Sequence, residues 1–142
     1  MRPSKGEGVF VVHCSSAMYQ PYFQDFLRDQ LRLKHYGLLA LPGGVQSLTL
    51  EEHLPKFAWA AWRHIKFLVD LDAPSRIILI GHDDCRWYHR GPIAHFIGPE
   101  RARQESDLKK VAASWKERFP GAAIEMYYAT AGDGKSTFDA VR

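Results

Sequence analysis

Residues 76–85 read RIILIGHDDC, and the first six of them decide the expected fold. A short, continuous β-branched and aliphatic run of this kind is typical of a strand buried on both faces of a parallel sheet. Two comparable runs precede it, at residues 8–13 (GVFVVH) and 37–41 (GLLAL), and another follows at 123–129 (AIEMYYA). The sequence therefore predicts a sheet in which parallel pairing predominates.

Segments with helical periodicity separate these strands. Apolar side chains recur three or four positions apart over residues 19–34, from a cap at Thr49 to about Leu71, and again over 108–119. The resulting order, β-α-β-α-β-α-β, predicts right-handed crossovers with helices on the faces of the sheet. We therefore expect an α/β fold, a three-layer sandwich around a mainly parallel sheet of about four strands.

The chain is expected to form one domain over residues 1–142, with a short polar N-terminus at 1–7 and a flexible tail from about 131 to 142. A chain of this length buries about 70% of its unfolded surface, enough for one core. The net charge is +3, and the basic residues are scattered among acids, so we expect no nucleic-acid partner. No apolar run approaches the ~20 residues that span a bilayer. We therefore expect no membrane contact and a cytoplasmic protein.

One histidine and two cysteines follow the ends of predicted strands. Cys14 closes the first strand, whereas His82 and Cys85 follow the third. Because ligands of parallel α/β sheets bind outside the carboxyl ends of the strands, we expect these side chains to meet at one edge. Zinc favours nitrogen and sulfur donors, and three protein ligands leave a fourth position for water, as in catalytic sites. The pattern is therefore that of a catalytic Zn2+ site.

Other interpretations of these residues stay open. Cys14 and Cys85 are the only cysteines of the chain, and free cysteines are often small core residues, here beside a turn histidine. The two could instead form a disulfide, which needs Cα atoms within about 7 Å, although a reduced cytoplasm argues against it. A third interpretation is a cysteine-based enzyme in which His82 activates one of the thiols.

The order of these motifs resembles that of the β-class carbonic anhydrases. In that family a cysteine follows the first buried strand, a glycine pair the second and His-x-x-Cys the third. The resemblance implies the fold of that family and a zinc site formed by Cys14, His82 and Cys85. The glycine pair, Gly43 and Gly44, is a candidate substrate-binding element because glycine lets backbone N–H groups approach a ligand closely.

The sequence departs from the family beside the metal. The family's first motif continues as Cys-x-Asp-x-Arg, but this chain has Ser16 and Met18 at those two positions. The charged pair that orients the metal-bound hydroxide is missing. The candidates to replace it are Ser16, Asp83 and Asp84, as hydrogen-bond partners of the metal's water or as a fourth ligand.

Two functions follow from the resemblance. The first is a zinc-dependent, carbonic anhydrase-like lyase in which zinc-bound hydroxide attacks CO2 or a related small linear substrate. The alternative is a noncatalytic zinc-binding, regulatory or assembly domain that keeps the fold and the metal. The resemblance also implies a small-molecule substrate such as CO2 or bicarbonate, and a homodimer or larger homo-oligomer. His13, His89 and His95 are candidate proton relays because an unperturbed imidazole changes its charge near neutrality, although surface or packing roles are the simpler interpretation.

Overall fold

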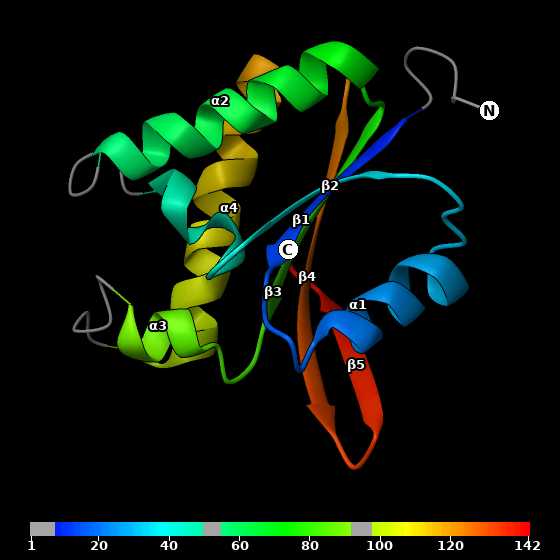
Figure 1. The fold of residues 1–142 in the computed structure, drawn as a ribbon, viewed down its shortest axis with the longest axis vertical. Helices are drawn as coiled ribbons and strands as arrows, with labels where there is room; N and C mark the ends of the chain where they lie inside the picture. The colour runs from blue at the N-terminus through cyan, green and yellow to red at the C-terminus, as the bar shows by residue number, and fades with distance from the viewer. Residues whose placement is uncertain (1–7, 50–54, 92–97) are drawn as a thin grey trace.

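The computed structural model describes residues 8–49, 55–91 and 98–142 of the chain, and within them five strands form one sheet (Figure 1). The strands lie in the order β2-β1-β3-β4-β5. The first four in this order are parallel, and β5 runs antiparallel to β4. Their bounds are β1 Val9–Cys14, β2 Gly37–Leu41, β3 Arg76–His82, β4 Ala123–Gly132 and β5 Lys135–Ala140. The predicted α/β fold with a mainly parallel sheet is confirmed.

Helices cover both faces of this sheet (Figure 1). On one face lie α1 (Gln20–Asp25) and the π-helical turn η1 (Phe26–Gln30), and on the other lie α2 (Pro55–Asp72) and α4 (Glu100–Arg118). Two short elements follow strands directly: the 3-10 helix η2 (Gly44–Thr49) after β2, and α3 (Arg86–Arg90) after β3. None of the helices in the described part of the chain combines the length and apolarity required to cross a membrane.

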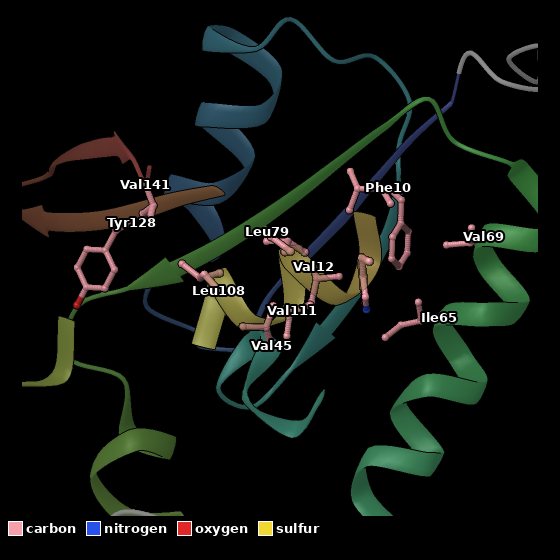
Figure 2. Packing of buried hydrophobic residues seen from close by; sticks show 13 residues of the cluster. Phe10, Val12, Val45, Ile65, Val69, Leu79, Leu108, Val111, Tyr128 and Val141 are labelled. Atoms are coloured by element: carbon pink, nitrogen blue, oxygen red, sulfur yellow. The ribbon is translucent and has the colours of Figure 1, made fainter. Parts of the chain in front are cut away.

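Side chains of β1 and β3 alternate between two apolar layers, as the pleat of a strand requires. One layer faces α2 and α4 (Figure 2), and its buried residues include Phe10, Val12, Ile65, Leu79, Leu108 and Val111. The other faces α1 and η1, and its buried residues include Val11, Phe23, Phe26, Leu27, Ile78 and Ile80. Cys14 therefore leaves β1 on the α4 side, whereas His82 leaves β3 on the α1 side.

The C-terminal segment differs from the sequence-based expectation. We expected about four strands and a flexible tail from about residue 131. Instead, β4 extends to Gly132, a tight turn follows, and β5 pairs with β4 as a fifth strand. The turn residues Asp133 and Gly134 have φ angles of 53° and 74°, as a two-residue hairpin turn requires. Phe138 of β5 stacks on Phe26, which anchors this edge strand. The sequence analysis missed β5 because most of its residues are polar.

One helix boundary also differs from the prediction. The last helix begins at Glu100, well before the expected start near residue 108. Thr49 ends η2, and its hydroxyl donates to the backbone oxygen of Gln46 at 2.8 Å. The predicted cap of the long helix by Thr49 stays a prediction, because residues 50–54 lie outside the described part of the chain and α2 is described from Pro55. The expectations for residues 1–7 and for His95 fall outside the described residues.

Candidate metal centre

The carboxyl ends of β1 and β3 bring Cys14, His82 and Cys85 together. The ligand atoms of the three side chains lie within 4.8 Å of one another, and the two Sγ atoms are 3.9 Å apart. All three residues are buried, with 5%, 1% and 1% of their surface exposed. Across residues 8–49, 55–91 and 98–142, no other group of three or more His, Cys, Asp or Glu side chains converges in this way.

The separation of the sulfur atoms suits a tetrahedral metal ion. With metal–sulfur bonds of about 2.3 Å, two thiolates of a tetrahedral zinc lie about 3.8 Å apart. A disulfide would need about 2.0 Å, and both cysteines are free here. Two sulfurs and one imidazole are donors that zinc prefers. The residues present therefore fit a metal ion of this kind.

The orientation of His82 also suits a metal ligand. Its Nδ1 lies 2.7 Å from the backbone oxygen of Asp83, which can only accept, so Nδ1 carries the proton. Nε2 is then a lone-pair donor, and it is buried without a hydrogen-bond partner among the described residues. An unpartnered buried polar atom costs about 1–3 kcal/mol. Metal-ligating histidines commonly hold a backbone carbonyl with the other ring nitrogen in this way.

Gly43 brings the backbone against Cys14. Its N–H donates to Cys14 Sγ at 3.4 Å, and its φ of 77° is a left-handed conformation that favours glycine. A Cβ at this position would lie 2.2 Å from Cδ1 of Trp87. Gly44 follows with a φ of 62°, and a Cβ there would lie 3.5 Å from the backbone nitrogen of Cys14. The pair thus lies at the site, and its contact with a substrate stays a prediction.

The two thiols differ in acidity because they share a hydrogen bond. The pKa of Cys14 lies below its ordinary value, first because Cys85 donates to its sulfur and also because the Gly43 N–H stabilises the thiolate, while burial acts in the opposite direction. The pKa of Cys85 is raised because it gives that hydrogen bond and is buried. One thiolate is therefore favoured before any metal binds, and a bound cation would favour the second.

The carboxylates of Asp83 and Asp84 do not belong to the close group of ligand atoms. Both residues are exposed, and the Asp84 side chain, 92% exposed, lies 4.0 Å from Nε2 of His89. Ser16 is half-buried, and its backbone oxygen accepts a hydrogen bond from Gln20 at 2.8 Å. Met18 is exposed. The predicted roles of Ser16, Asp83 and Asp84 toward a bound ligand stay predictions.

Two residues that the sequence analysis did not identify contact this site from α4. Glu100 Oε1 accepts the backbone N–H of Cys85 at 2.7 Å. The Gln104 side chain accepts the N–H of His82 at 3.0 Å and donates to the backbone oxygen of His82 at 2.6 Å. Glu100, Gln104 and the buried Leu108 are spaced four positions apart, which places them on one face of a helix. The sequence analysis did not use this spacing because the first turns of the helix are polar.

Two of the histidines considered as proton relays, His13 and His89, have other partners. His89 Nε2 lies 2.8 Å from Glu100 Oε2 at the surface. His13 is buried, its Nδ1 lies 2.8 Å from the backbone oxygen of Cys14, and its ring stacks on Phe23. Neither imidazole belongs to the close group of ligand atoms.

Comparison of the whole structure with solved structures finds carbonic anhydrases. One from Glaciozyma antarctica has a TM-score of 0.57 at 16% identity, over 99% of this chain and 85% of the other. One from Streptococcus mutans has a TM-score of 0.54 at 15% identity, over 100% of this chain and 86% of the other. No protein-family model and no curated protein sequence matches the chain. At these identities the likeness shows the fold, which is similar to that of carbonic anhydrases, as the sequence motifs predicted.

Proposed function

We propose that this protein is a zinc-dependent, carbonic anhydrase-like lyase that acts on CO2 or a related small linear molecule. The observation that carries the proposal is the buried Cys14, His82 and Cys85 group at the carboxyl ends of β1 and β3. The likeness in fold to carbonic anhydrases supports the proposal. The fold does not carry the proposal by itself, because one fold can host many functions and a function is argued from the chemistry of its site.

In the proposed site, two thiolates and Nε2 of His82 hold the metal. Three protein ligands leave one coordination position open, which distinguishes catalytic zinc sites from closed structural ones. Zinc in such a site lowers the pKa of a coordinated water to about 7 and so supplies a nucleophile at neutral pH. Cys14 and Cys85 balance the two positive charges of the ion when both are ionised.

The surroundings favour a small neutral substrate. The Tyr19 ring packs over His82 with ring centroids 4.3 Å apart, and Trp87 packs against Gly43. Aromatic side chains of this kind would shield the site from water and would suit a molecule as apolar as CO2. Arg86 and Arg90 are exposed on the short helix that follows Cys85 and favour an anionic product such as bicarbonate.

A noncatalytic zinc-binding or assembly domain is the second candidate. It is favoured by the residues that follow Cys14, because Ser16 and the exposed Met18 supply no charged pair to orient a nucleophile. In this case the metal stabilises the junction of β1 and β3. Assembly into a homodimer or larger oligomer is a prediction of both candidates, and light scattering of the purified protein measures it.

The two candidates are separated by measuring zinc content and CO2 hydration on the same samples. We would compare the parent protein, Cys14→Ser and His82→Ala with His64→Ala, an exposed histidine on α2, as the control. The proposal predicts near-stoichiometric zinc and hydration in the parent and in His64→Ala, and loss of both in the other two variants. Zinc without hydration in the parent supports the noncatalytic domain, and a parent without zinc contradicts both candidates.

A further inference from the structure

The N-terminal part of α4 is hydrogen-bonded to the turn that carries two of the proposed metal ligands. Gln104 bonds to both backbone groups of His82, accepting its N–H at 3.0 Å and donating to its oxygen at 2.6 Å. Gln104 itself is buried. A side-chain amide that satisfies both polar groups of one residue fixes the position of that residue much as a neighbouring strand would.

Glu100, one helical turn earlier, holds the other end of the same turn. Its Oε1 accepts the N–H of Cys85 at 2.7 Å and the Gln104 amide at 2.9 Å. Its Oε2 lies 2.8 Å from Nε2 of His89, so both carboxylate oxygens are occupied. Hydrogen bonds to an ionised acceptor are about twice as strong as neutral ones. His82 and Cys85 are therefore attached to one rigid helix.

Two backbone features indicate that this attachment matters for the turn. A Cβ at Gly81 would lie 2.8 Å from Oε1 of Gln104, so the absence of a side chain at Gly81 permits the approach of α4. Asp84, inside the turn, has a φ of 52°. A non-glycine residue in this conformation is strained and persists only where the surrounding structure holds it.

We infer that Glu100 and Gln104 are positioning residues for the metal centre, which set its affinity by holding His82 and Cys85 at the separation from Cys14 that one ion requires. Neither side chain is a ligand, and both act through the backbone of the ligands. The inference rests on the proposed function, because it takes the group of three ligands to be a metal site. Metal sites lose affinity when the groups that orient their ligands are removed.

The inference predicts the effect of four substitutions on the dissociation constant for zinc. Gln104→Leu and Glu100→Ala remove the bonds to His82 and Cys85 and should raise this constant about 10- to 100-fold. Gly81→Ala should act in the same direction, since its new Cβ displaces Gln104. Glu100→Gln keeps an acceptor oxygen for the Cys85 N–H and should restore most of the affinity.

The test is chelator competition on the zinc-loaded full-length proteins, together with thermal unfolding of each protein with and without zinc. The control is Glu105→Gln, which removes the carboxylate of a surface ion pair with Arg101 on the same helix and should leave zinc affinity unchanged. A positioning role predicts weaker zinc binding and a smaller rise in Tm on zinc addition, because the stabilisation by a ligand depends on its concentration relative to Kd.

A merely structural role predicts a different pattern, in which the Tm falls equally with and without zinc and the dissociation constant is unchanged. Zinc held as tightly by Gln104→Leu and Glu100→Ala as by the parent would overturn the inference and leave the proposed function intact. A parent protein that binds no zinc would overturn the proposed function and the inference with it.

Discussion

Cys14 and Cys85 are separated by 71 positions in the sequence, yet their sulfur atoms lie 3.9 Å apart. The proximity follows from the parallel pairing of β1 with β3, in which Val12 lies opposite Leu79. Both strands therefore end at the same edge of the sheet, one at Cys14 and the other just before the turn to Cys85. Because a slip of one residue would move Cys14 to the other face of the sheet, the register of these strands determines the site.

Metal removal should change the reactivity of both thiols together. We expect Cys14 and Cys85 to react slowly with a thiol reagent in the zinc-loaded native protein, and at least about tenfold faster after a chelator is added, since the metal-free thiolate is the nucleophile. Thiol titration with and without the chelator measures this. One thiol that reacts rapidly before and after chelation would instead support a cysteine-based enzyme.

Gly43→Ala should destabilise the fold. The φ of 77° disfavours any side chain, and the added Cβ would lie 2.2 Å from the Trp87 ring. We expect the free energy of unfolding to fall by about 1–3 kcal/mol, as overpacking and a left-handed backbone together imply. Urea denaturation measures the change. Gly121→Ala is the matched control, because a Cβ at Gly121 meets nothing within 4 Å.

Gln46→Met should stabilise the protein. Gln46 is fully buried in η2, and neither of its amide atoms has a hydrogen-bond partner among the described residues. An apolar side chain of similar shape removes this cost, so we expect the free energy of unfolding to rise by about 1 kcal/mol. The exposed Gln24, replaced by Met, should change it by less than about 0.5 kcal/mol. A loss of stability in Gln46→Met would show that the amide is bonded.

The ion pair between Arg76 and Glu125 should make stability depend on pH. Both guanidinium nitrogens Nε and Nη2 donate to this carboxylate, and these hydrogen bonds lower the pKa of Glu125. A carboxyl group whose pKa is lower in the folded state stabilises the fold above its unfolded pKa of about 4.3, and this contribution is lost as the pH falls through the folded pKa.

Glu125→Gln should therefore lower the free energy of unfolding by about 1 kcal/mol at pH 7 and by much less near pH 3. Denaturant unfolding of the parent and the variant at both pH values measures the difference. Asp25→Asn removes the carboxylate of an exposed ion pair with Arg28 and should have little effect at either pH. A loss of the same size at both pH values would contradict the expected role of the Glu125 charge.

The sequence predicted those parts of the fold that continuous apolar runs mark. The strand ending at Cys14 and the strand ending at His82 are buried on both faces, so their composition alone identifies them. The edge strand β5 is half exposed, and its polar composition is the same as that of a disordered tail. Only the structure shows that its apolar residue, Phe138, packs on Phe26. Local composition does not record pairing with a neighbouring strand.

The same limit applies to the candidate site. Cys14, His82 and Cys85 could be selected because their side chains are rare and each follows a strand end. Gln104 could not, because it is a polar residue at a core-facing position of α4, where helical periodicity predicts an apolar side chain. Its partner is the backbone of His82, and a bond to the backbone leaves no signal in the identity of the partner residue.

The most direct test of the metal centre is X-ray absorption at the zinc edge of protein purified without added metal. Cys14, Cys85 and His82 predict two sulfur neighbours at about 2.3 Å and two nitrogen or oxygen neighbours at about 2.0 Å, the second of these from a solvent ligand. Protein without zinc, or zinc surrounded only by nitrogen and oxygen, would contradict the assignment of these three residues as its ligands.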